Sequence, residues 1–157
     1  MSWYEATALC RWLSEKLSLE TRLPHENEWQ LAAQWDGKKQ DRSRYFAWGG
    51  TEHDGDFAQR CNCGRTGLGH TSAVGLFPMG KAKCGAMDLS GNVWEWNEAV
   101  IGSYRGLRGG SFTTYGVGRY LHAANRYNAG YPTYESGSVG FRVSEVPEPT
   151  SLALLAL

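Results

Sequence analysis

The sequence lacks a long apolar run, an excess of charge of either sign and an N-terminal export signal. Its only uniformly apolar stretch, residues 152–157, is far shorter than the ~20 residues that cross a bilayer as a helix. The 16 Lys and Arg balance the 16 Asp and Glu, so no general attraction to nucleic acid or anionic lipid is expected. No charged segment followed by an apolar one opens the chain, so no secretory signal peptide is visible.

Glycine and aromatic residues are abundant instead. The 157 residues include 20 Gly, 7 Trp, 8 Tyr and 5 Phe, and the glycine share is well above the ~7% of average proteins. At 41% hydrophobic and 20% charged, the chain is too apolar for a disordered protein, and its length suits one domain that buries roughly two thirds of its unfolded surface. Because glycine favours turns, we expect a loop-rich domain with a core of aromatic side chains.

Cysteine is scarce and unevenly placed. The four cysteines are Cys10, Cys61, Cys63 and Cys84, and none follows position 84. The Cys61-x-Cys63 spacing is tight for a mutual disulfide, and no second paired Cys or His motif accompanies it. Three interpretations stay open: free structural thiols, one or two disulfides, or a metal site.

Two helices are predicted near the start of the chain. Ser2 and Glu5 fit a capping box, and apolar residues recur at helical spacing over Trp3–Leu17. A second short helix is predicted over residues 23–33, with a proline at its start and acidic residues in its first turn. Residues 36–78 show neither helical nor alternating periodicity but hold several aromatic residues. We expect a long ordered loop region there, with an internal tie such as a bound cation.

Several short strings of residues then point to a family. Residues 87–96 read Met-Asp-Leu-Ser-Gly-Asn-Val-Trp-Glu-Trp, residues 107–112 read Leu-Arg-Gly-Gly-Ser-Phe, and residues 139–143 read Val-Gly-Phe-Arg-Val. Together with Ala47-Trp48-Gly49, they resemble the formylglycine-generating enzyme family, also called the sulfatase-modifying factor domain. The motifs follow family order from residue 2 to residue 143.

The resemblance implies a fold and a domain boundary. The implied fold class is α+β: the sulfatase-modifying-factor variant of the C-type lectin fold, with low regular secondary structure, short kinked antiparallel strands and two or more helices. Residues 1–144 would form this domain. Because the family domain begins well before the Ser-Trp-Tyr-Glu-Ala helix of residues 2–6, we expect N-terminal strands to be missing and the chain to be a fragment.

The copper chemistry of the family is not expected here. The resemblance implies that two cysteine thiolates bind Cu(I), which activates dioxygen to oxidise a substrate cysteine. The first of these positions falls on Thr114 and the second on Gly118 or Arg119, so both thiolates are absent and copper is not expected as a cofactor. Ser111 and Trp94 match family residues beside the reactive centre, although Trp94 is also a typical core residue.

The histidines give little support to another metal chemistry. His122 lies in a stretch that reads as a strand near the would-be reactive centre. No second histidine pairs with it in the pattern of an iron site, so the iron-dependent chemistry of a sister branch of this fold is not favoured.

Calcium is the cofactor that the resemblance does imply. Calcium prefers six to eight oxygen ligands, and loops supply several of them as backbone carbonyls. One family site matches two carboxylates and two carbonyls, from Asp88, Gly91, Val93 and Glu95. The alternative is that Glu95 pairs with an arginine such as Arg108 or Arg142. A second, weaker site has a threonine in place of the family's acidic ligand, and it matches Asn62, Cys63, Thr66 and Leu68.

The last residues suggest a sorting signal. Residues 145–157 contain Pro147-Glu148-Pro149 and then the apolar run, which resembles the start of a PEP-CTERM signal without the rest of its helix and its basic cluster. In that family, a membrane peptidase of the exosortase type removes the signal from an exported protein. The resemblance implies export to the cell envelope or extracellular matrix of a Gram-negative-type bacterium. The alternative is a proline-rich tail that closes the domain.

Functions of different classes remain open. The first is an exported, surface-associated, non-catalytic module that binds or displays a peptide or glycan. Its pocket would be rimmed by side chains that combine rigid contact area with adaptable hydrogen bonds, namely Thr113, Thr114, Tyr115, Tyr127, Asn128, Tyr131 and Tyr134. The alternative is that these tyrosines only cover a loop-rich core. The second function is a formylglycine-generating-type oxidoreductase that oxidises a protein cysteine, or a related oxidase with altered ligands. A third possibility is a decayed pseudo-enzyme.

Overall fold

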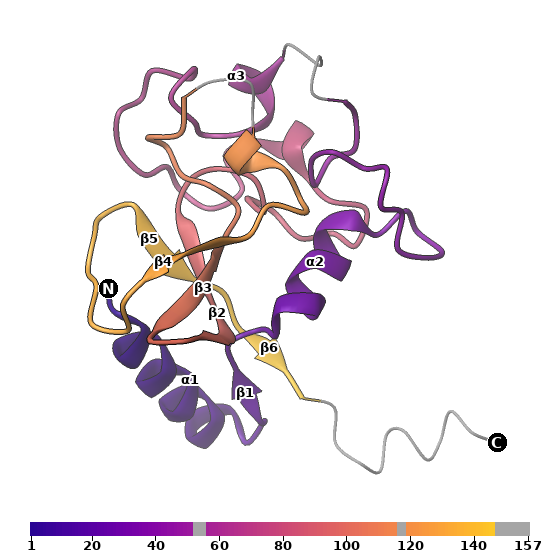
Figure 1. Cartoon of the computed structure of the whole chain (residues 1–157). Coiled ribbons are helices and arrows are strands. Elements are labelled where there is room, and N and C mark those ends of the chain that lie inside the picture. The colour runs from indigo at the N-terminus through magenta and orange to yellow at the C-terminus, as the bar shows by residue number, and fades with distance from the viewer. Residues whose placement is uncertain (52–55, 116–118, 147–157) are drawn as a thin grey trace, which may run out of the picture.

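The computed structural model describes residues 1–51, 56–115 and 119–146 and shows short elements joined by long loops (Figure 1). The helices are α1 (Trp3–Leu17), α2 (Glu26–Gln34) and α3 (Phe57–Arg60), with single 3₁₀ turns η1 (Pro78–Gly80) and η2 (Arg119–Leu121). The strands are β1 (Thr21–Arg22), β2 (Trp94–Ile101), β3 (Tyr104–Arg108), β4 (Tyr127–Gly130), β5 (Val139–Phe141) and β6 (Ser144–Glu145). This composition confirms the expected α+β class with little regular structure.

The strands form two small sheets. The larger sheet has the order β4-β3-β2-β5, and the smaller one pairs β1 with β6. The pairs β1–β6, β2–β3 and β3–β4 are antiparallel, as expected, and register shifts interrupt β2–β3 and β3–β4. The exception is β5, which runs parallel to β2, with Glu95 opposite Gly140. This parallel pairing brings the end of the domain beside the start of β2.

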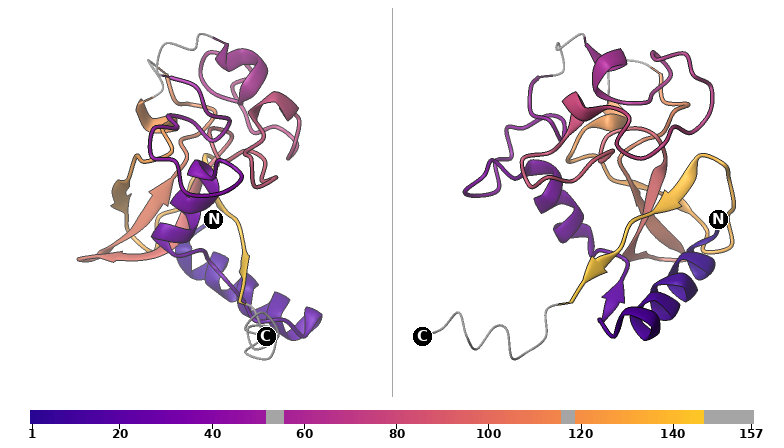
Figure 2. Two further views of the ribbon diagram at one scale, coloured as in Figure 1. Left: turned by 90° about the vertical axis from the view of Figure 1, so that its right-hand side faces the viewer. Right: turned by 180° about the vertical axis from the view of Figure 1, so that it is seen from behind.

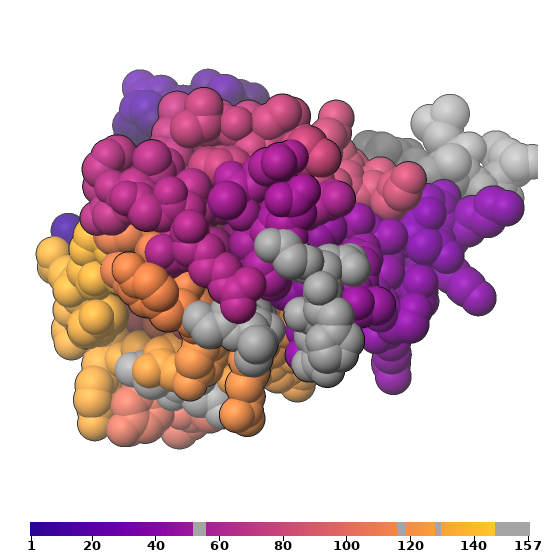
Figure 3. All heavy atoms as spheres, turned by 90° about the horizontal axis from the view of Figure 1, so that it is seen from above, coloured from indigo at the N-terminus to yellow at the C-terminus, as the bar shows by residue number. Residues whose placement is uncertain are grey.

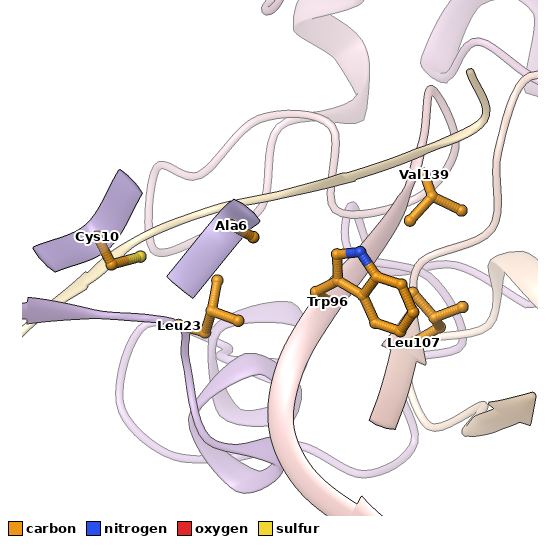
Figure 4. Packing of buried hydrophobic residues seen from close by; sticks show 6 residues of the cluster. All are labelled: Ala6, Cys10, Leu23, Trp96, Leu107 and Val139. Atoms are coloured by element: carbon orange, nitrogen blue, oxygen red, sulfur yellow. The ribbon is translucent and has the colours of Figure 1, made fainter. Parts of the chain in front are cut away.

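Helix α1 is stabilised at its N-terminus as the sequence predicts. The Ser2 hydroxyl accepts from the Glu5 N–H at 3.3 Å, and the Glu5 carboxylate accepts from the Ser2 N–H at 2.7 Å. The buried face of the helix packs on the sheet around the fully buried Trp96 (Figure 4). The buried members of this core cluster are Ala6, Cys10, Leu23, Trp96, Leu107 and Val139.

Helix α2 begins at Glu26, later than residue 23, where the sequence pattern begins. The Glu28 carboxylate accepts from the His25 N–H at 2.7 Å, which satisfies a donor that the first turn leaves free. Trp29 is 1% exposed and belongs, with Ala47 and Leu89, to a second core cluster. The buried residues of this helix are Trp29, Ala33 and Gln34.

The loops gather at the end of the molecule opposite α1 and the β1–β6 pair (Figure 2). In residues 36–93, the described part contains only α3, η1 and isolated bridges, which confirms the expected irregular region. Its side chains nevertheless pack closely, because a third core cluster consists of Phe46, Phe57, Cys61, Cys63 and Leu121. Through Leu121, this cluster joins the loop region to η2.

The predicted sorting segment lies almost wholly outside the description. Residues 147–157 are not among the described residues, whereas Ser144 and Glu145, on the two sides of the predicted domain boundary, both belong to β6. Among the described residues, no helix is long and apolar enough to cross a membrane.

Candidate functional site

A pocket of about 490 Å³ opens at the loop end of the larger sheet. It is formed by β2, β3, the loop that follows β3, η2, β4 and the segment that leads into β5. Figure 3 looks down on this end and shows a hollow between the orange and yellow parts of the chain. The lining residues are Trp94, Leu107, Thr113, Thr114, Tyr115, Tyr120, Tyr127, Tyr134, Ser138 and Val139.

Three aromatic rings form one wall of the pocket. The indole of Trp94 stacks on the ring of Tyr127, with 4.9 Å between ring centroids and 26° between planes. Tyr120 meets both rings edge-on, at 5.9 Å and 6.0 Å. Such contacts hold the rings rigidly and leave an apolar surface beside tyrosine hydroxyls. Trp94 is therefore a pocket residue, although it also packs against the first core cluster.

Another part of the lining is the tight turn after β3, which carries the position of the first copper-binding cysteine that the family resemblance implies. The Thr114 hydroxyl accepts from the Ser111 N–H at 3.0 Å, and the Ser111 hydroxyl lies 2.9 Å from that of Thr113. Ser111 is fully buried and does not line the pocket. The Thr114 hydroxyl that lines the pocket is therefore already hydrogen-bonded within its own turn. Gly118 lies outside the described residues, and Arg119 is exposed on η2.

The structure brings most of the predicted rim together. Thr113, Thr114, Tyr115, Tyr127 and Tyr134 all line the pocket, as predicted.

Two members of the predicted rim have other outcomes. Tyr131 is not a lining residue, because its hydroxyl pairs with that of Tyr104 at 3.1 Å. The side chain of Asn128 lies outside the description.

Sequence reasoning missed four lining residues. They are Leu107, Tyr120, Ser138 and Val139. The last two reach the pocket through the parallel pairing of β5 with β2, in which the Trp94 N–H donates to the Ser138 carbonyl at 2.8 Å. No local sequence pattern predicts a parallel strand pairing. Tyr120 could have been predicted, because it directly follows Arg119, one of the positions matched to the family's second copper-binding cysteine.

Near the first predicted calcium site, the Glu95 carboxylate is fully engaged. Arg142 donates to it from Nε at 2.6 Å and from Nη2 at 2.5 Å, and the Trp29 indole N–H donates at 2.6 Å. Asp88 accepts from the Gly75 N–H at 2.7 Å. Asp88, Val93 and Glu95 still line a common cavity of about 320 Å³. The structure therefore has the alternative arrangement, in which Glu95 pairs with an arginine, Arg142. Calcium binding at this site would require the Arg142 side chain to move away from Glu95.

The second predicted calcium site offers a clearer donor. Asn62 is fully buried, and its Oδ1 atom has no hydrogen-bond partner among the described residues. The backbone carbonyl oxygen of Asn62 accepts a hydrogen bond from the Asn92 N–H at 2.7 Å. The Thr66 hydroxyl, in contrast, donates to the Cys61 carbonyl at 2.8 Å and accepts from the Cys63 N–H at 3.0 Å. A buried, unpaired oxygen is what a cation would satisfy, so Asn62 is the donor that fits calcium best. Calcium binding stays a prediction.

The four cysteines are free thiols, and two of them, Cys61 and Cys63, belong to the same core cluster. Cys61 and Cys63 are both buried, and the hydrogen bond from the Cys61 thiol lowers the pKa of Cys63 to about 6. The same hydrogen bond, together with burial, raises the pKa of Cys61. Cys10 is buried in the first core cluster, away from the other cysteines, and Cys84 is exposed. The alternative of one or two disulfides is therefore not realised in this structure.

His122 does not lie in a strand, contrary to the sequence interpretation. It follows η2 in a bend, where its Nδ1 atom accepts from the Ala124 N–H at 3.0 Å. Its ring meets Tyr45 edge-on at 3.9 Å between centroids. Turn residues at 123–124 follow His122 before β4 begins at Tyr127, so this stretch lacks the alternation that a strand would require. His122 is not among the lining residues of the pocket.

Residues 1–146 match the sulfatase-modifying factor enzyme 1-like domain family. Similar proteins include the hercynine oxygenase of Mycobacterium tuberculosis, 33% identical over 71% of this chain and 28% of its own length. Others are the inactive C-alpha-formylglycine-generating enzyme 2 of Bos taurus, 32% identical over 90% of this chain, and the formylglycine-generating enzyme of Streptomyces coelicolor, 31% identical over 96%. The chain spans 48% and 53% of those two relatives.

Solved structures agree with this assignment of the fold. Treponema denticola variable protein 1 superimposes with a TM-score of 0.72 and 25% identity, over 91% of this chain and 68% of that one. PvdO from Pseudomonas aeruginosa gives a TM-score of 0.74 and 23% identity, over 92% and 60%. With the short strands described above, these matches confirm the expected variant of the C-type lectin fold.

Proposed function

Because the chain belongs to the sulfatase-modifying factor enzyme 1-like domain family, we propose that it is a non-catalytic binding domain whose ligand occupies the aromatic pocket. One observation carries the proposal. The described lining residues supply aromatic rings, hydroxyls and aliphatic groups, and none of them is a cysteine, a histidine or a charged residue. A pocket of this kind can hold and orient a ligand, and its described lining supplies no cysteine thiolate or imidazole to bind a redox metal.

The pocket chemistry favours an uncharged, hydroxyl-rich ligand, and we assign it to a glycan. The stacked pair of Trp94 and Tyr127 gives a flat apolar surface on which one face of a sugar ring can lie. The lining also includes Thr113, Thr114 and Ser138, whose hydroxyls can each donate and accept hydrogen bonds. A peptide is the competing ligand, and it is an outcome of the test below.

Other parts of the proposal rest on the family and on the tail. The similarity to a protein named as inactive supports a non-catalytic role. We further propose that calcium stabilises the loops, and that residues 145–157 direct export through exosortase-type machinery to the cell envelope or matrix.

A glycan and peptide array with the full chain tests the binding role. We expect signals for a restricted set of glycans, which Tyr127→Ala should abolish. The control is Tyr131→Ala, which makes the same change at an exposed tyrosine outside the pocket. Thermal melts of both variants would verify folding, because Tyr127 also packs on Trp94. No array signal, or equal loss in both variants, would contradict the proposal, and peptide signals alone would replace glycan with peptide.

A second candidate is an oxidoreductase, which the similarity to a formylglycine-generating enzyme and a hercynine oxygenase favours. The discriminating assay supplies Cu(I), dioxygen and a sulfatase-motif peptide, and detects the aldehyde with a hydrazide reagent. We expect no aldehyde. Aldehyde formation above a heat-denatured control would establish the enzyme and overturn the non-catalytic role.

A further inference from the structure

A second pocket, of about 430 Å³, lies beside helix α2 and shares no lining residue with the aromatic pocket. Its lining consists of two arginines, three side-chain amides and one leucine, namely Asn27, Gln30, Leu31, Gln40, Arg42 and Arg126. Asn27, Gln30 and Leu31 recur at intervals of three and four residues, so they share one face of α2. The pocket therefore joins that face to the loop after α2 and to the residue that precedes β4.

The loop after α2 is tied back to the end of the helix. The Asp41 N–H donates to the Gln34 carbonyl at 2.8 Å. The fully buried Gln34 side chain accepts at Oε1 from Gln30 Nε2 at 3.0 Å and from Gln40 Nε2 at 3.1 Å. These bonds hold the loop that carries Arg42 beside the amide face of α2.

The pocket carries an excess of positive charge. Arg126 donates from Nη2 to the Gln30 Oε1 atom at 3.3 Å, and its Nε lies 3.3 Å from the Glu26 carboxylate. The same carboxylate lies 3.2 Å from the fully buried guanidinium of Arg108, so one acid serves two arginines. The exposed side chain of Arg42 forms no hydrogen bond or ion pair with the described residues. Guanidinium donors of Arg42 and Arg126 are therefore free to bind an anion.

The acidic side chains of the same loop do not enter the pocket. Asp36 accepts from the Lys38 N–H at 2.7 Å, and Asp41 accepts from the Ser43 N–H at 2.9 Å. Neither carboxylate is among the described lining residues. An anion between the two arginines would therefore meet no carboxylate in the described lining.

An apolar groove adjoins this pocket at Leu31. The groove has a volume of about 330 Å³ and is lined by Glu28, Leu31, Ala32, Trp35 and Cys84. Leu31 lines both cavities and is 42% exposed. The Glu28 carboxylate is held by Arg22 at 2.7 Å, so it is already paired. A cationic pocket and an apolar groove thus meet at one side chain.

We propose that the pocket and the groove form one site for an aliphatic carboxylate. The carboxylate accepts charge-assisted hydrogen bonds from Arg42 and Arg126, whose planar guanidinium groups match its two oxygens. The aliphatic chain crosses Leu31 and covers Ala32 and Trp35, which removes apolar surface of both partners from water. A neutral aliphatic molecule or a small inorganic anion would use only half of the site. The proposal is independent of glycan binding, because the aromatic pocket contributes no residue to this site.

Calorimetric titration of the full chain with octanoate, below its micelle concentration, tests the site. We expect one equivalent bound per chain. Affinity should rise from butanoate through hexanoate to octanoate, because each methylene that becomes buried strengthens binding by up to about fourfold. Acetate, inorganic phosphate and octanamide should each bind at least about tenfold more weakly than octanoate. Acetate or phosphate binding as tightly as octanoate would overturn the aliphatic ligand, and octanamide binding as tightly would overturn the role of the arginines.

Two pairs of variants locate the bound ligand. Arg42→Gln changes an exposed side chain without a described partner, so the chain should fold, and octanoate affinity should fall about tenfold. Its control is Arg11→Gln, at an exposed arginine of α1 that lines neither cavity. Leu31→Ser should reduce the dependence on chain length, and Leu17→Ser, at an exposed leucine of α1, should not. An absence of octanoate binding to the wild type, or equal effects of a site variant and its control, would refute the site.

Discussion

The guanidinium of Arg142 donates two hydrogen bonds to the carboxylate of Glu95, with nitrogen–oxygen distances of 2.5 Å and 2.6 Å. The two residues lie 47 positions apart, and their contact fastens the C-terminal end of the domain to β2. The side chain of Glu95 is 5% exposed and that of Arg142 is 25% exposed. The Trp29 indole N–H completes the shell of donors at 2.6 Å. The pair therefore joins β2, helix α2 and the segment after β5.

Breaking this pair should destabilise the domain strongly. Arg142→Gln leaves the Glu95 charge buried with one neutral donor, which typically costs about 3 kcal/mol, and a loss of that size lowers Tm by roughly 6–12 °C in a chain of this length. The control is Arg22→Gln, because the Arg22–Glu28 pair is 27% and 43% exposed, and such pairs contribute less than about 1 kcal/mol. Calorimetry compares the two. Equal shifts would mean that Glu95 does not depend on Arg142.

Acid should weaken the Arg22–Glu28 pair at a defined pH. The hydrogen bonds from Arg22 are the main cause that lowers the pKa of Glu28 from about 4.5 to about 2. The group therefore adds stability above pH 4.5, and that stability is lost as pH falls through 2. Because the pair is exposed, its contribution stays below about 1 kcal/mol. The Tm difference between wild type and Glu28→Gln should shrink from about pH 6 to about pH 2. A constant difference over this range would contradict the assignment.

Gly110 is required where the chain leaves β3 for the pocket turn. Gly110→Ala meets two problems: a positive φ of 75°, and an added Cβ only 2.7 Å from the Leu121 Cδ2. Gly67→Ala is a matched control, because its φ is also 75° and nothing lies within 4 Å of an added Cβ. Both changes should cost about 1–2 kcal/mol for the backbone, and Gly110→Ala should cost a further ~1–3 kcal/mol for overpacking. Urea unfolding measures the difference, and equal losses would show that packing at Gly110 is unimportant.

The sequence motifs and the pocket were not equally predictable. The capping box of Ser2 and Glu5 is a local pattern, and the structure has it as predicted. Glu95 was recognised as a special residue, but its choice between calcium and Arg142 depends on which side chains arrive from 47 residues away. Ser138 reached the pocket through a parallel strand pairing, which leaves no periodic trace in a three-residue strand. Local motifs could therefore be predicted from the sequence, whereas the pairing of strands and side chains that lie far apart in the chain could not.

Calcium binding should be decided at Asn62, because its buried Oδ1 atom has no hydrogen-bond partner among the described residues. At a calcium concentration about 100-fold above Kd, a bound ion adds about 2.7 kcal/mol and raises Tm by roughly 5 °C or more. Asn62→Ala should remove the difference between calcium and chelator, whatever its own baseline stability. Thr66→Asp restores an acidic ligand to the loop and should enlarge the difference, and magnesium should have no effect, since it prefers a tighter octahedral shell. An unchanged midpoint with calcium in both the wild type and Thr66→Asp would reject this site.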